Sequence, residues 1–86
     1  MKDLKRLVKS FLFRRGYETD NSARNTFEKG INKVSFWYQQ GISGGLIYCP
    51  DHVTIFINDE PIIVNEDESY DEIYSYLEFS FSRYEK

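Results

Sequence analysis

Strand-forming segments follow one another closely in the middle of this 86-residue chain. Residues 33–39, 46–49, 52–58 and 62–64 are rich in β-branched and aromatic residues. Parallel neighbours need long crossover connections, and only short turns separate these segments. They therefore predict a four-stranded antiparallel meander. The predicted turns are G-I-S-G-G (41–45), C-P-D-H (49–52, a type I turn) and D-E-P (59–61).

A helical pattern stands at each end of the chain. Residues 2–15 place apolar side chains at helical spacing, and Gly16 is suited to end that helix. Near the other end, Ser69 and Glu72 match a capping box, and we expect a helix over residues 69–84. The alternative is a short helix followed by a fifth strand at 77–82, because L-E-F-S-F-S alternates apolar and polar residues.

Together these patterns predict a single α+β domain over residues 1–86, in the order α-β-β-β-β-α. We expect the N-terminal helix against one face of the meander and the C-terminal helix completing the core. Residues 17–30 are polar and mixed, and they are interpreted as a loop with a short extended piece near 26–29.

The chain has the composition expected of a cytoplasmic protein. It has a single cysteine, whereas small extracellular domains usually carry several. The sequence contains no signal-peptide pattern and no apolar run long enough to span a membrane. We therefore expect a cytoplasmic location and no membrane partner.

Charge is divided unevenly along the chain. Residues 1–43 carry a net charge of +5 and residues 44–86 carry −8, which gives −3 overall. The two halves should attract each other, and they form separate surface patches only if the fold keeps them apart.

Catalytic and metal-binding patterns are weak. Cys49 and His52 could form a thiolate–imidazole pair across the predicted turn, but no third member or oxyanion site accompanies them. A zinc site needs four ligands at recognisable spacing, and N-E-D-E-S-Y-D-E (65–72) lacks the pattern of a calcium loop. The glycines at 41, 44 and 45 lie between strands, where a phosphate-binding loop would open a helix. We therefore expect no metal, no cofactor and no catalytic residue, and an enzyme using Cys49 and His52 is the most distant alternative.

Nucleic-acid binding is the first alternative function. The first helix carries basic side chains, and F-W-Y (36–38) could supply base stacking. The order of elements resembles that of double-stranded-RNA-binding domains, although that family begins its last helix with basic residues and this chain has Glu66 to Glu72 there. The candidate residues are Lys2, Lys5, Arg6, Lys9, Arg14 and Arg15.

Binding of a protein partner is the favoured function. If one face of the sheet packs on a helix, Trp37 and Phe56 remain on the other face. Tyr76 and Phe79 lie off the main apolar stripe of the C-terminal helix, and Phe13 lies among basic residues of the first. This excess of aromatic surface predicts an interface, either with another protein or with a second copy of the chain.

An acidic stretch adds to this hypothesis. Inhibitors from phages and mobile elements often have this size and charge, and some imitate the charge spacing of nucleic acid. We therefore expect a regulatory or inhibitory binding module whose surface combines Trp37, Phe56, Tyr76 and Phe79 with the acidic stretch. The acidic residues are Asp59, Glu60, Glu66, Asp67, Glu68, Asp71 and Glu72.

Overall fold

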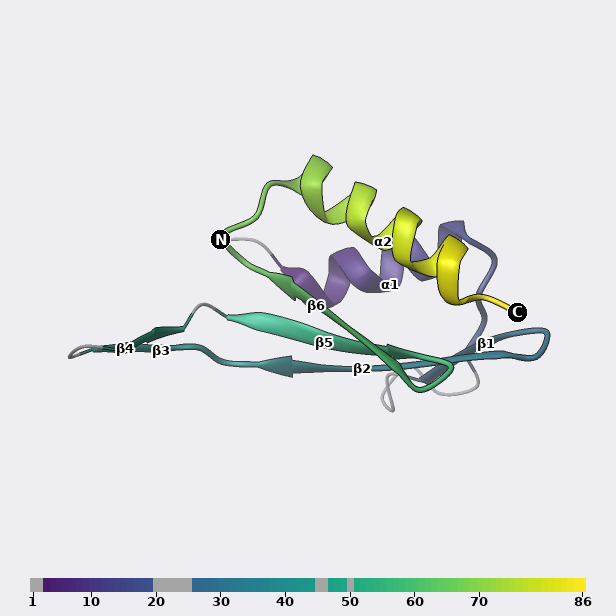
Figure 1. The fold of residues 1–86 in the computed structure, drawn as a ribbon, viewed down its shortest axis with the longest axis horizontal. Coiled ribbons are helices and arrows are strands. Elements are labelled where there is room, and N and C mark those ends of the chain that lie inside the picture. Colours follow the sequence, from purple (N-terminus) through teal and green to yellow (C-terminus); the bar gives the residue numbers. More distant parts are fainter. Residues whose placement is uncertain (1–2, 20–25, 45–46, 50) are drawn as a thin grey trace.

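The chain folds into an antiparallel sheet with two helices on one of its faces (Figure 1). The computed structural model describes residues 3–19, 26–44, 47–49 and 51–86. The helices are α1 (Leu4–Arg14) and α2 (Tyr70–Tyr84). The strands are β1 (Thr26–Lys29), β2 (Asn32–Gln39), β3 (Ile42–Gly44), β4 (Ile47–Cys49), β5 (His52–Ile57) and β6 (Glu60–Asn65).

The main sheet has four antiparallel strands in the order β1-β2-β5-β6. This confirms the predicted α+β class and the four-stranded meander between two helices. Strands alternate their side chains between faces, so residues of one parity along each strand form the core. Phe27, Phe36, Ile55 and Val64 are among the core residues that point toward the helices.

The segments that pair differ from those expected. β1 joins the sheet as a full strand, paired with β2 from Thr26↔Ser35 to Lys29↔Asn32, where only a short extended piece was predicted. Its outer edge is met by Glu18, which forms an isolated bridge with Glu28. Phe27 gives the strand its single buried side chain, which is why a four-residue strand holds its place here.

β3 and β4 form a separate two-stranded ribbon. The prediction that residues 46–49 belong to the main sheet was wrong, as was the hairpin at 49–52, because β4 pairs with β3 and β5 pairs with β2. The register runs on unchanged from Gln39↔His52 to Ile42↔Cys49. β2–β3 and β4–β5 are therefore the two arms of one long hairpin. In Figure 1 the ribbon continues the plane of the sheet beyond the helices.

The first helix ends as its sequence predicts. Asp3 caps its N-terminus by accepting a hydrogen bond from the backbone N–H of Arg6. At the other end, the Tyr17 N–H donates to Leu12 O and the Gly16 N–H donates to Phe13 O, which is a Schellman motif. This motif needs the positive φ of +96° that Gly16 supplies. The chain turns back and buries Tyr17 in the core.

The second helix is continuous from Tyr70 to Tyr84, so the alternative strand at 77–82 was wrong. Ser69 and Glu72 form the predicted capping box. Leu77 and Phe81 are buried, whereas Phe79 between them is 65% exposed. A strand would have placed all three side chains on one face, and a helix separates them. The Phe11 and Phe81 rings meet edge to face at 5.0 Å and hold the two helices together.

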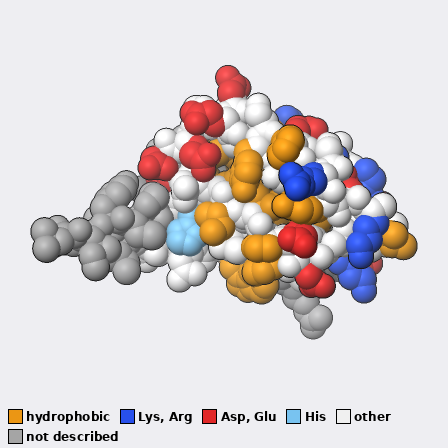
Figure 2. All heavy atoms as spheres, viewed as in Figure 1, with side chains coloured by type: hydrophobic (Ala, Val, Ile, Leu, Met, Phe, Trp, Pro, Cys, Tyr) orange, Lys and Arg blue, Asp and Glu red, His pale blue; other side chains and the backbone are white. Residues whose placement is uncertain are grey.

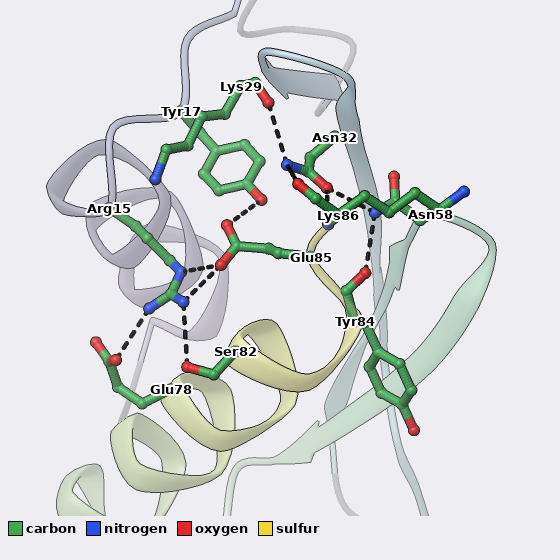
Figure 3. A network of polar contacts seen from close by, with 10 residues as sticks. All are labelled: Arg15, Tyr17, Lys29, Asn32, Asn58, Glu78, Ser82, Tyr84, Glu85 and Lys86. Carbon is green, nitrogen blue, oxygen red and sulfur yellow. Dashed lines mark hydrogen bonds and ion pairs between the residues drawn. The ribbon is translucent and has the colours of Figure 1, made fainter.

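A polar network fastens the end of α2 to the rest of the domain (Figure 3). The Glu85 carboxylate accepts hydrogen bonds from Arg15 Nε at 2.9 Å and from the Tyr17 hydroxyl at 2.6 Å. Asn58 Nδ2 donates to Asn32 Oδ1 at 2.8 Å and to Tyr84 O at 3.1 Å. These contacts join the C-terminal end of α2 to the end of α1 and to the turns at one end of the sheet.

Candidate interaction surface

The sheet has one face that no described helix or strand covers, called here the open face. Both helices lie on the other side (Figure 1). Hydrophobic side chains emerge along the lower edge of Figure 2, which is the side away from the helices. By strand alternation, the residues of the open face are Thr26, Glu28, Lys33, Ser35, Trp37, Gln39, His52, Thr54, Phe56, Pro61, Ile63 and Asn65.

The strand register arranges these residues in rows across the face. Trp37 lies opposite Thr54, which lies opposite Ile63 on the next strand. Phe56 is two residues beyond Thr54, and its ring meets the Trp37 ring edge to face at 5.3 Å. Trp37 is nevertheless 56% exposed. An aromatic pair thus stands at the centre of the face with an exposed isoleucine beside it.

The open face carries almost no charge. Glu28 and Lys33 are its only acidic and basic residues, and they are direct cross-strand partners of opposite sign. In the whole chain 29% of residues are charged. Depletion of charge around exposed aromatic side chains is typical of the centre of a protein interface.

Both edges of the main sheet are protected against an added strand. At β6 the outward N–H of Asn65 donates to Glu68 Oε1, and Pro61, which has the same parity, has no N–H. At β1 the Glu28 N–H and O are both bonded to the backbone of Glu18. Strand addition needs a row of free backbone groups, and these contacts interrupt that row at both edges, which favours binding of a partner to the face.

A groove of about 490 Å³ opens beside the aromatic pair. Phe56, Ser35 and Thr26 line it from the open face, together with the charged pair Glu28 and Lys33. The turns at the same end of the sheet supply Ile31 and Asp59, and the C-terminal residue Lys86 completes the charged rim. The sequence reasoning missed Ile31 and Ile63. Ile63 was identifiable as the outward residue of I-I-V (62–64), but the face it points to depends on the register of β6.

The structure does not bring all the predicted partner-binding residues together. Trp37 and Phe56 lie on the open face, whereas Tyr76 and Phe79 are exposed on the helix layer. The acidic stretch is divided as well. Asp59 and Glu60 lie at one end of β6 and residues 66–72 lie at the other, separated by a six-residue strand of about 20 Å. One partner surface cannot reach all of these residues without wrapping around the domain.

The acidic residues near the start of α2 have a local role. Glu72 completes the capping box, and Asp71 lies in the first turn, where negative charge suits the helix dipole. Figure 2 shows acidic side chains gathered over this end of the helix layer and basic side chains toward the opposite end. The uneven charge of the sequence therefore appears as a separation along the molecule.

The residues predicted to bind nucleic acid lie in different environments. Lys2 lies outside the described residues. Lys5, Arg6 and Arg14 are exposed on α1, and Lys9 is half-buried. Arg15 is bound by Glu85 and Glu78 within the domain, and its hydrogen bond with Glu85 leads the interactions that raise its pKa. The F-W-Y triplet (36–38) is also divided, because Phe36 is buried while Trp37 points to the open face.

A second polar cluster lies where the ribbon meets the sheet. The Asp51 carboxylate accepts hydrogen bonds from the Tyr38 hydroxyl and from the Gly41 N–H, both at 2.5 Å. The bond to Asp51 raises the pKa of Tyr38 to about 12. It also lowers the pKa of Asp51, together with the Gly41 bond. The Lys5 ammonium lies 5.5 Å from the centre of the Tyr38 ring. These contacts fix the base of the ribbon.

The described residues provide little support for a catalytic or metal-binding site. The side chain of Cys49 lies outside the described residues, so its predicted pairing with His52 stays a prediction. Among the described residues, no group of three or more His, Cys, Asp or Glu side chains is placed to hold a metal ion. No helix in the described part of the chain is long and apolar enough to cross a membrane.

Comparison with known proteins adds no assignment. No family model, no curated protein and no solved structure matches this chain.

Proposed function

We propose that this chain is a non-enzymatic protein-binding module, regulatory or inhibitory in kind, and that its binding surface is the open face. The observation that carries the proposal is the Trp37–Phe56 pair, with Trp37 exposed and Phe56 half-buried, on a charge-poor sheet face that neither helix covers. Burial of aromatic side chains contributes much of the energy of protein interfaces, and such side chains are enriched among their hot spots.

The chemistry of the face supports a protein partner over a nucleic acid. Binding to single-stranded nucleic acid needs a positively charged groove beside its stacking aromatics. The open face offers Lys33, and Glu28 stands directly opposite it. The exposed basic residues of α1 lie on the helix layer, on the other side of the sheet from Trp37.

Two matched substitutions test the proposal. Trp37→Lys and Phe79→Lys each replace an exposed aromatic residue by a lysine, one on the open face and one on the helix layer. In quantitative affinity capture from cells that express the protein, we expect Trp37→Lys to reduce the captured partner at least tenfold and Phe79→Lys to leave it unchanged. If Phe79→Lys reduces the captured partner and Trp37→Lys does not, the interface lies on the helix layer and the proposal is wrong.

Nucleic-acid binding through α1 is the second candidate, because Lys5, Arg6 and Arg14 remain exposed. It predicts that the protein retards DNA or RNA on a gel with an affinity that falls steeply as salt rises. Lys5→Glu combined with Lys9→Glu should then abolish the retardation, and Trp37→Lys should not. That pattern would favour this candidate over the open face.

A further inference from the structure

We infer that the partner of the open face is a second copy of this chain. This inference rests on the proposed function and identifies the molecule that binds to the open face. In the dimer two open faces pack against each other, and the helix layers lie on the outside. Sheets pack face to face about 10 Å apart with their strand directions within about 30°, so the dimer is a β-sandwich of two four-stranded sheets.

Charge supports a self-association through this face. The chain carries a net charge of −3, so two copies repel each other only weakly as whole molecules. The open face holds one acidic and one basic residue and is neutral when His52 is neutral. Residues 66–72 and the basic side of α1 belong to the helix layer, so they stay away from the contact. The open face is therefore a large surface that two copies can share without like-charge contacts.

The ribbon supports the same contact. A two-stranded hairpin is marginally stable alone in water, and no described helix covers β3 and β4 (Figure 1). The ribbon lengthens the molecule: its radius of gyration is 13.2 Å, against about 12 Å for a compact domain of this size. Residues 34–50, which run from β2 through the ribbon, include no charged residue in the sequence. A second copy packed along this plane would lie over the main sheet and the ribbon together.

The size of the surface indicates which class of interface to expect. Four strands about 4.8 Å apart and about 20 Å long give a flat footprint of about 400 Å² per copy, and the ribbon adds about 100 Å². Two copies then bury about 1,000 Å² in total, which lies at the lower limit for a specific interface. We therefore expect a weak, reversible dimer with a micromolar rather than nanomolar dissociation constant.

The symmetry of the contact explains why association stops at two copies. Face-to-face packing uses the same surface on each copy, so the contact is closed. The protected edges at Asn65, Pro61 and Glu28 oppose the lateral strand pairing that would extend the assembly. The dimer is then the end product, and fibres are not expected.

The single tryptophan of the chain, Trp37, reports on this contact directly. We expect sedimentation velocity to show a monomer–dimer equilibrium as the concentration rises from micromolar to millimolar. Over the same range the Trp37 emission should shift to the blue and its quenching by acrylamide should fall. Thr54→Lys and Ile63→Lys place a charge on the open face, and each should weaken dimerisation at least tenfold. Phe79→Lys is the matched control and should leave it unchanged.

The outcomes separate the two proposals. If the wild type stays monomeric over this range while Trp37→Lys still loses a captured partner, the second copy is wrong and the protein-binding face survives. If Thr54→Lys and Ile63→Lys dimerise as well as the wild type does, the dimer uses another surface and the inference is wrong. If a single-stranded oligonucleotide quenches Trp37 with a strongly salt-dependent affinity and no dimer forms, both proposals are wrong. Far-ultraviolet circular dichroism of each variant checks that it is folded.

Discussion

Replacing Glu85 by alanine should destabilise this domain far more than an ordinary surface substitution. The Glu85 carboxylate is only 17% exposed and accepts three hydrogen bonds, from Arg15 Nε and Nη2 and from the Tyr17 hydroxyl. Tyr17 is buried, so in Glu85→Ala its hydroxyl loses its acceptor, which costs about 1–3 kcal/mol. Arg15 keeps Glu78 and Ser82 as partners, so it loses only part of its interactions.

The two contributions together predict a loss of about 2–4 kcal/mol in the free energy of unfolding. The control is Glu78→Ala, because Glu78 binds the same guanidinium at 2.9 Å but is 62% exposed. An exposed ion pair contributes about 0.2–1 kcal/mol, so this variant should lose no more than that. Both variants remove a glutamate from Arg15, but only Glu85→Ala removes a buried carboxylate and leaves the Tyr17 hydroxyl without its acceptor.

Urea unfolding at pH 7, followed by circular dichroism, measures both variants. A small domain loses about 1 kcal/mol of stability per molar urea, so Glu85→Ala should lower the midpoint by about 2 M or more. The same substitution should cost about 1 kcal/mol less when Tyr17 is already phenylalanine, because no hydroxyl is then left unpaired. Equal midpoints for Glu78→Ala and Glu85→Ala would refute this reasoning about burial. So would a variant with both Tyr17→Phe and Glu85→Ala whose loss of stability equals the sum of the two single losses.

Three further predictions concern the same fold. Burial alone would raise the pKa of Glu85, but its hydrogen bonds outweigh that effect and lower the pKa. Because the pKa of Glu85 is lower in the folded state, its ionised carboxylate stabilises the protein above the usual glutamate pKa of about 4.3, and this stabilisation is lost as the pH falls below that value. Glu85→Gln should therefore flatten the loss of stability between about pH 5 and pH 2 in urea titrations. Asp59 has a φ of +71°, so Asp59→Gly should raise the unfolding free energy by about 0.5–1 kcal/mol, and a lower midpoint would contradict this. Phe81→Ala removes a fully buried ring that packs on Phe11 and should cost about 3–5 kcal/mol in chemical denaturation, whereas a loss below 1 kcal/mol would mean that the helices do not depend on this contact.

Local patterns predicted the helices well. Gly16 ends α1, and Ser69 with Glu72 begins α2, because each of these signals acts on backbone groups a few residues away. The ambiguity at 77–82 was resolved by packing, since a strand would put Leu77, Phe79 and Phe81 on one face, whereas the helix buries Leu77 and Phe81 and leaves Phe79 exposed. Chain order and strand-rich segments were likewise sufficient for the α+β class.

Pairing between distant residues was the part that the sequence could not supply. C-P-D-H (49–52) has the composition of a tight turn, yet His52 continues the arm that β4 begins, because β5 finds its partner in β2. The candidate surface divided for the same reason. Trp37 and Phe79 are both aromatic residues outside a predicted core, and only the placement of α2 puts them on opposite layers.

The unchanged register between Gln39↔His52 and Ile42↔Cys49 makes the long hairpin a graft point. The described core side chains lie under β2 and β5, before the ribbon begins, so replacing residues 40–50 by a short turn should leave all of them in place. Lengthening or shortening both arms by two residues keeps every side chain on its own face, whereas a change of one residue in each arm would exchange the faces beyond it. Homologues of this domain should therefore differ in ribbon length by even steps, and an engineered chain can carry a foreign hairpin at this position.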